Sequence, residues 1–108
     1  MASVPEITPQ ELKRRLDTGE PVTVLDVREP WECAIAHLGG SLNIPLNEVP
    51  SRLGELDSAA ETVVMCKAGG RSRRAAEFLA SHGFGRVVNL TGGIDAWSRD
   101  IDPGLARY

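Results

Sequence analysis

The chain has 108 residues with a formal net charge of −3, and 42% of the residues are hydrophobic and 25% charged. These values predict one globular domain over residues 1–108 that buries a core without disulfide or metal staples. They argue against a nucleic-acid binder, and the lack of a long apolar run or a secretory leader pattern predicts a cytoplasmic protein with no membrane partner.

The first elements alternate between strand and helix. A short strand is expected around Glu6-Ile7, and Thr8-Pro9-Gln10-Glu11 has the pattern of a helical capping box, with Gly19 at the far end of that helix. Residues 22–27 form an almost continuous apolar run, which is typical of a strand covered on both faces. Glu29-Pro30-Trp31-Glu32 then opens a short helix.

The rest of the chain continues the alternation. In order, we expect a short strand at 42–45, a weaker helix at 49–56, a strand at 62–66, the strongest helix at 71–82, a strand at 86–90 and a helix at 94–99. This order predicts an α/β fold: a mainly parallel sheet of four to five strands, flanked by helices on both faces.

Cys66 lies at the predicted carboxyl end of a buried strand, which is where ligands bind in parallel α/β sheets. The glycine pair behind it lets successive N–H groups point inward as an anion-binding nest, and the start of the next helix adds donors and partial positive charge. Helix N-termini and basic neighbours lower a cysteine pKa from about 8.5 to about 3.5–7.5. The residues expected to bind sulfur or an anionic substrate are Lys67, Ala68, Gly69, Gly70, Arg71 and Ser72, with Arg73 and Arg74 adding positive charge.

The position of Cys66 in the sequence allows two interpretations of its role. The first is a small buried residue at the end of a core strand. The second, favoured by the glycines, the arginine and the helix start, is a nucleophilic thiolate, with Ser72 either capping the helix or donating a hydrogen bond to sulfur.

The spacing from Cys66 to Arg71 is C-x4-R. Cysteine phosphatases use C-x5-R, a loop that surrounds a tetrahedral phosphate. A loop shorter by one residue suits a sulfur atom better than a phosphoryl group, and no obvious general acid is present, although Asp26 or Glu29 could be considered.

Four blocks of the sequence together resemble the rhodanese family. They are residues 25–32 (LDVREPWE), 37–45 (HLGGSLNIP), 66–72 (CKAGGRS) and 89–97 (NLTGGIDAW). The resemblance implies a catalytic persulfide at Cys66, held by the backbone of the loop from Lys67 to Arg71, and a ping-pong cycle between a sulfur donor and an acceptor. No cofactor or metal is implied.

The ending, residues 96–108, is similar to the close of rhodanese domains in the molybdopterin-synthase sulfurylases. That similarity implies a ubiquitin-like sulfur-carrier protein and its adenylating enzyme as partners, besides thiosulfate or a persulfide as donor.

Several residues near the predicted site have two interpretations. Arg28 is either an anion-steering residue or, with Asp26, part of an ion-paired scaffold. Cys33 is a resolving cysteine or, preferably, a packing residue, and His37 and His82 are expected to be structural. Gly92-Gly93 is expected to allow close backbone packing before the last helix.

Three functions follow. The favoured one is a sulfurtransferase that moves a sulfane sulfur through Cys66. The alternatives are a non-catalytic sulfide-sensing or docking module and, more distantly, a cysteine phosphatase or arsenate reductase.

Overall fold

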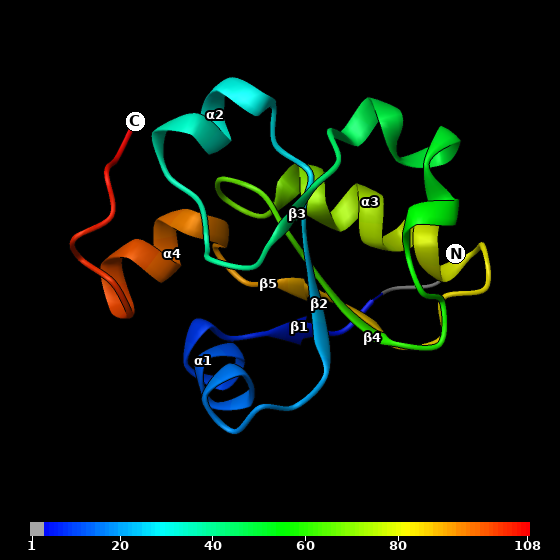
Figure 1. Cartoon of the computed structure of the whole chain (residues 1–108), viewed down its shortest axis with the longest axis horizontal. Coiled ribbons are helices and arrows are strands. Elements are labelled where there is room, and N and C mark those ends of the chain that lie inside the picture. Colours follow the sequence, from blue (N-terminus) through cyan, green and yellow to red (C-terminus); the bar gives the residue numbers. More distant parts are fainter. Residues whose placement is uncertain (1–3) are drawn as a thin grey trace.

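Residues 4–108, which the computed structural model describes, build one five-stranded sheet in which every strand pairing is parallel (Figure 1). The strand order is β1-β5-β4-β2-β3, so the chain crosses over the sheet repeatedly instead of forming hairpins. The strands are β1 (Glu6–Ile7), β2 (Val22–Asp26), β3 (Leu42–Asn43), β4 (Glu61–Met65) and β5 (Val87–Leu90). The predicted α/β fold is confirmed.

Helices connect the strands and cover both faces of the sheet. They are α1 (Pro9–Asp17), α2 (Pro30–Ile35), α3 (Gly70–Ala80) and α4 (Gly93–Asp100), with two 3-10 helices, η1 (Leu46–Ser51) and η2 (Leu53–Glu55). The α-helices lie within one or two residues of the predicted ranges. Among the residues that the structure describes, no helix is long and apolar enough to cross a membrane.

The helix predicted at residues 49–56 is wrong. The structure has η1 and η2 there, because Pro50 lies inside the segment and cannot supply the N–H of an α-helical hydrogen bond. The tighter 3-10 pattern accommodates such short pieces.

The capping box lies at a different helix from the one predicted. Thr8 does cap α1, since its hydroxyl accepts a hydrogen bond from the Glu11 N–H at 3.1 Å, but the Glu11 carboxylate binds Arg14 and Arg15. The reciprocal pair instead opens α2, where the side chains of Glu29 and Glu32 each accept from the other's backbone. Glu32 is thereby fixed at the carboxyl edge of the sheet.

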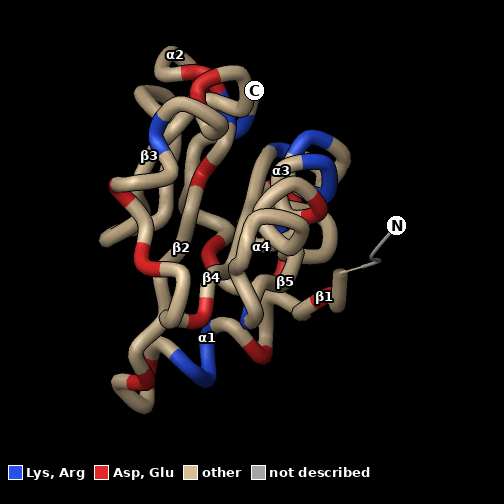
Figure 2. The backbone as a smooth tube through the Cα atoms, turned by 90° about the vertical axis from the view of Figure 1, so that its right-hand side faces the viewer, with Lys and Arg blue, Asp and Glu red and all other residues tan. Residues whose placement is uncertain are grey.

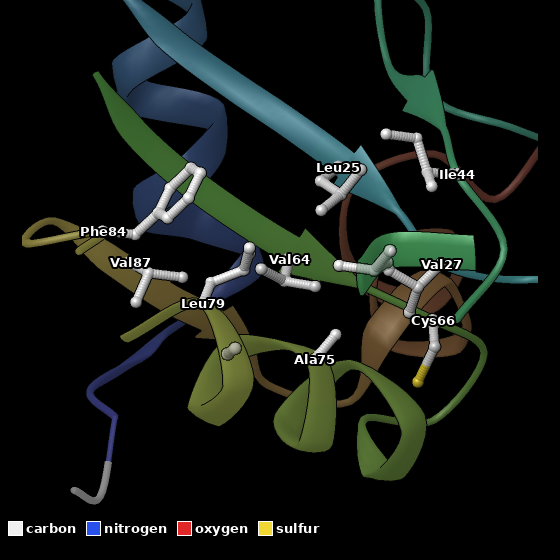
Figure 3. Packing of buried hydrophobic residues seen from close by; sticks show 11 residues of the cluster. Leu25, Val27, Ile44, Val64, Cys66, Ala75, Leu79, Phe84 and Val87 are labelled. Carbon is white, nitrogen blue, oxygen red and sulfur yellow. The ribbon is translucent and has the colours of Figure 1, made fainter. Parts of the chain in front are cut away.

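Two buried clusters pack on the two faces of the sheet. On one face the core lies under α3 and η1, and Figure 3 shows it as a row of side chains that ends at Cys66. On the other face it lies under α1 and α4. Central members of the first cluster are Leu25, Val27, Ile44, Val64, Ala75 and Leu79, and those of the second are Leu12, Val63, Met65, Leu90, Ile94 and Trp97.

Since all strands run in the same direction, their carboxyl ends meet at one edge of the sheet. Asp26 ends β2, Cys66 follows β4, and Gly93 follows the end of β5. Strand β4 ends at Met65, one residue earlier than predicted, so Cys66 is the first residue of the loop. Three chain segments thus converge on Cys66.

Candidate active site

The loop after β4 turns back on the sulfur of Cys66. Gly69 has a φ of 115°, a left-handed conformation that a glycine adopts without strain, and α3 begins at the next residue. The turn brings the Gly69 N–H to 3.0 Å from Cys66 Sγ, where it donates a hydrogen bond. Figure 3 shows the sulfur at the end of β4, directed toward the first turn of α3.

The surroundings of Cys66 favour its thiolate. Burial alone raises the pKa of the thiol, because a charged sulfur is poorly solvated inside the protein. Hydrogen bonds from the Ser72 hydroxyl and from the N–H groups of Ser72, Gly69 and Ala68 outweigh that effect, and the pKa is lowered from its usual value. The loop therefore stabilises negative charge on sulfur in the way expected of a nucleophile.

The Ser72 hydroxyl has more than one acceptor within reach. It donates to the side-chain oxygen of Asn89 in β5 at 2.5 Å or to the Gly69 carbonyl at 3.1 Å, and it also contributes to the lowered pKa of Cys66. A hydroxyl has a single hydrogen, so it donates to one of these acceptors at a time. Asn89 is fully buried and also donates to the Gly69 carbonyl at 3.3 Å, so it helps to hold the Gly69 turn in place.

The two cations of the loop are held by carboxylates. The Lys67 ammonium lies 3.0 Å from Asp95 Oδ2, and Arg71 donates to both oxygens of Glu32 at 2.7 and 2.9 Å. The hydrogen bonds to Glu32 are the main cause of the raised pKa of Arg71, and the negative charge of Cys66 adds to it. Thiolate stabilisation therefore comes mainly from hydrogen-bond donors, and less from free positive charge than the sequence suggested.

The first turns of α3 carry two further arginines, Arg73 and Arg74, whose side chains are exposed to solvent. Figure 2 shows Lys and Arg positions gathered at the start of this helix. Arg73 reaches Glu6 at 3.3 Å, and Arg74 makes no ion pair within residues 4–108.

The N-terminus of α4 braces the same loop. The N–H groups of Ile94 and Asp95 donate to the carbonyls of Cys66 and Lys67 at 2.9 and 3.0 Å. A side chain at Gly93 would collide with these carbonyl groups, so the backbone approach requires glycine there. Gly92-Gly93 thus serves close packing, as predicted.

Asp26 and Arg28 form a buried ion pair beside the loop. Both side chains are inaccessible to solvent, and Arg28 Nη2 lies 2.7 Å from Asp26 Oδ2. The same guanidinium donates to the Ala36 carbonyl at 2.7 Å and to the Tyr108 hydroxyl at 2.9 Å. With its donors engaged inside the protein, Arg28 suits a scaffold better than a surface that attracts anions.

The second cysteine and the histidines make structural contacts. Cys33 is a free, half-buried thiol that donates to Asp26 Oδ2 at 3.5 Å, and burial next to this carboxylate raises its pKa to about 11. His37 Nδ1 lies 3.3 Å from the Cys33 carbonyl, and His82 Nδ1 lies 2.8 Å from the Phe78 carbonyl. Neither the Cys33 thiol nor these rings adds a nucleophile.

Three residues that contribute to the site were not predicted from the sequence. Glu32 and Asn89 fall inside the family-like blocks, and a buried polar residue in an otherwise apolar strand was the available signal for Asn89. Tyr108 gave no local signal, because its contacts are with residues about 80 positions away.

This arrangement can carry out nucleophilic chemistry at one sulfur atom. Cys66 supplies the thiolate, and loop N–H groups offer donors to an anion bound against it. Within the described part of the chain, no three His, Cys, Asp or Glu side chains are grouped so as to hold a metal ion.

Comparison with known proteins gives consistent matches. The family model described as "Rhodanese-like domain" matches residues 8–100. A protein of Allochromatium vinosum named sulfurtransferase is 38% identical over 103 residues, which cover 95% of this chain and 96% of that protein. The probable adenylyltransferase/sulfurtransferase MoeZ of Mycobacterium tuberculosis is 38% identical over 104 residues, which cover 94% of this chain and 26% of that protein. The solved structure of a human single-domain sulfurtransferase has a TM-score of 0.83 at 26% identity and covers 90% of this chain and 97% of that chain.

Proposed function

The chain belongs to the rhodanese-like domain family, and from that premise we propose that it is a sulfurtransferase carrying a sulfane sulfur as a persulfide on Cys66. The observation that carries the proposal is the nest around this sulfur, in which the Gly69 N–H lies 3.0 Å away and the pKa of the thiol is lowered. Such a site favours both the attacking thiolate and the anionic persulfide that follows.

The first half-reaction uses thiosulfate or another sulfane donor. The Cys66 thiolate attacks the outer sulfur of thiosulfate, a new S–S bond forms, and the bond to the sulfonate sulfur breaks as sulfite leaves with its electron pair. The negative charge now rests on the outer persulfide sulfur, next to the loop N–H groups of residues 68–72. Total charge is conserved, and no external oxidant or reductant is needed.

The second half-reaction returns the enzyme to its thiolate. A thiophilic acceptor attacks the outer sulfur, the S–S bond breaks, and its electron pair returns to Cys66. With cyanide the product is thiocyanate. The similarity to a segment of the adenylyltransferase/sulfurtransferase MoeZ supports a second class of acceptor, the adenylated C-terminus of a ubiquitin-like carrier protein. With that acceptor the outer persulfide sulfur is the nucleophile: it attacks the acyl carbon, AMP leaves and an acyl disulfide forms. Two external thiols then reduce this disulfide, which releases the thiocarboxylate and restores Cys66.

Mass spectrometry of the intact protein tests the proposal. After incubation with thiosulfate and removal of excess donor, we expect one added sulfur atom, mapped by peptide analysis to Cys66. Addition of cyanide should remove that sulfur and release an equal amount of thiocyanate.

Two serine variants make the assignment specific. Cys66→Ser should abolish both the added mass and thiocyanate formation, whereas Cys33→Ser should retain them, because Cys33 has a raised pKa and bonds to Asp26. Turnover that survives Cys66→Ser refutes the proposal. A single loading that no acceptor discharges favours the sensing or docking module, and hydrolysis of phosphate esters that depends on Cys66 favours the phosphatase.

A further inference from the structure

The segment after α4 folds back across the site and ends at Tyr108. Both views of the molecule place this end of the chain beside α2 (Figures 1 and 2). The Tyr108 hydroxyl donates to Glu32 Oε2 at 2.7 Å and accepts from Arg28 Nη1 at 2.9 Å. Its ring meets Trp31 edge-on, with the ring centroids 5.8 Å apart.

Tyr108 also interacts with the two cations of the Cys66 loop, directly with Lys67 and through Glu32 with Arg71. The Lys67 ammonium lies 5.0 Å from the centre of the Tyr108 ring, within the range of a cation–π interaction. Glu32, which accepts the Tyr108 hydroxyl, is the carboxylate that holds the Arg71 guanidinium through two hydrogen bonds. One side chain is thus connected to both cations of the loop.

We propose that Tyr108 is a positioning residue that holds Lys67 and Arg71 beside the Cys66 loop, and so sets the affinity for an anionic sulfur donor. This inference rests on the proposed sulfurtransferase function. Lys67 is kept between the ring and Asp95, and Arg71 is kept in one orientation because Tyr108 fixes the Glu32 carboxylate that binds it.

The hydrogen bonds around Tyr108 have a defined direction. Burial and the neighbouring Glu32 carboxylate, opposed by Arg28, raise the pKa of Tyr108 to about 12, so its hydroxyl keeps its proton at neutral pH. The hydroxyl can therefore donate to Glu32 while its oxygen accepts from Arg28. The buried Asp26–Arg28 pair provides a rigid base for this chain of contacts.

Lys67 and Arg71 are each about one-third exposed, so a donor that reaches Cys66 passes beside both charges. Thiosulfate carries two negative charges, and an arene thiosulfonate carries one. If the two cations set donor affinity, loss of their positioning weakens binding of the dianion more than binding of the monoanion.

Single-turnover loading of Cys66, followed without an acceptor, measures donor affinity apart from chemistry. The half-saturating concentration of thiosulfate and the maximal loading rate are compared for the wild type, Tyr108→Phe and Tyr108→Ala. Phenylalanine keeps the ring beside Lys67 and Trp31 but loses the hydroxyl, whereas alanine loses both. Arg107→Gln is the matched control, because it removes a charge from the same exposed segment at a residue with no ion pair within residues 4–108.

We expect the half-saturating concentration to rise about three- to tenfold in Tyr108→Ala and by less in Tyr108→Phe. The maximal rate should stay within about twofold, because the hydrogen bonds to the Cys66 sulfur are intact. The rise should be smaller with the arene thiosulfonate, and Arg107→Gln should behave as the wild type.

An unchanged half-saturating concentration in both Tyr108 variants overturns the inference, as does an equal loss of rate with both donors. If the alanine variant does not fold, Tyr108→Phe decides alone. The ¹⁵N-detected signals of the Arg71 guanidinium give a readout that needs no sulfur transfer: slow rotation in the wild type should become faster in Tyr108→Phe. If wild-type Cys66 takes up no sulfur, the proposed function fails, and these signals still decide whether Tyr108 positions Arg71.

Discussion

The negative charge on Cys66 is stabilised chiefly by hydrogen-bond donors that the loop aims at one atom. Lys67 and Arg71 lie beside the sulfur but are bound to Asp95 and Glu32, which reduces the positive charge they offer to the thiolate. Hydrogen bonds to a charged acceptor are stronger than those between neutral groups. The Ser72 hydroxyl is the side-chain donor among them, so a substitution can remove it, together with its hydrogen bond to Asn89.

We expect Ser72→Ala to raise the pKa of Cys66 toward its usual value. The change removes a hydroxyl that favours the thiolate, and with it the hydrogen bond to the buried Asn89 side chain. The rate of alkylation by iodoacetamide, measured against pH, should show its inflection at higher pH, and the rate at neutral pH should fall several-fold. Ser81→Ala is the control, because Ser81 is exposed and bonds only to carbonyls of its own helix. An unshifted inflection in Ser72→Ala would contradict the role given to the hydroxyl.

The lowered pKa of Cys66 in the wild type also affects the stability of the fold. The pKa of Cys66 is lower in the folded protein than in the unfolded chain, so the thiolate stabilises the fold above the unfolded pKa. This contribution is lost as the pH falls through the folded pKa. In Ser72→Ala the folded pKa lies closer to the unfolded one. The gain in free energy of unfolding between neutral and alkaline pH should therefore be smaller in that variant.

At the level of elements, two helix N-termini meet at one loop. Helix α3 begins inside the loop and presents N–H groups to the sulfur, whereas α4 presents N–H groups to the carbonyls of Cys66 and Lys67. The two helices thus bind opposite sides of the same peptide segment. Its conformation depends on how closely α4 approaches, and that approach depends on Gly93.

We expect Gly93→Ala to destabilise the fold and displace the loop. The new methyl group would meet the carbonyls of Cys66 and Lys67, and the backbone of Gly93 has a φ of 58°, in the left-handed region. Overpacking costs about 1–3 kcal/mol, and the left-handed conformation adds roughly 1 kcal/mol. Urea unfolding gives the loss of stability, and thiosulfate loading of Cys66 reports the displaced loop.

Gly54→Ala is the matched control for this substitution. Gly54 lies in η2, where a methyl group would meet no atom within 4 Å. Its free energy of unfolding should be unchanged or slightly raised, because alanine restricts the unfolded chain. If Gly93→Ala is as stable and as active as Gly54→Ala, the contact between α4 and the loop does not matter.

At the scale of the whole molecule, a buried charge network joins distant parts of the chain. Arg28 binds Asp26 at the end of β2, the carbonyl of Ala36 after α2, and the hydroxyl of Tyr108. Both charges of the Asp26–Arg28 pair are removed from solvent. Such a pair is expensive to break, since the remaining charge is left buried without its partner.

We expect Asp26→Ala to lower the free energy of unfolding by about 3–5 kcal/mol, because the Arg28 guanidinium would stay buried without its carboxylate. Asp17→Ala is the comparison. It removes an ion pair with Lys13 in which both side chains are about half exposed, and such pairs contribute about 0–1 kcal/mol. Denaturant titration of the two variants measures the difference. Equal, small losses would contradict the scaffold role of the Asp26–Arg28 pair.

The sequence by itself determined the order of strands and helices, the parallel sheet and the position of Cys66 before a glycine turn and a helix. Each of these depends on neighbouring residues, such as apolar runs, the Gly69-Gly70 pair and the pattern of α3. Local patterns were weaker where one residue overrides a helical pattern: Pro50 lies inside η1, and two 3-10 helices replace the α-helix predicted at 49–56.

Only the tertiary structure decided what surrounds the loop. Lys67 and Asp95 are 28 residues apart, Arg71 and Glu32 are 39 apart, and Tyr108 and Arg28 are 80 apart. These residues meet because the order β1-β5-β4-β2-β3 gathers the carboxyl ends of β2, β4 and β5 at one edge of the sheet. Side-chain pairing across such separations depends on strand order and helix placement, which no short stretch of sequence encodes.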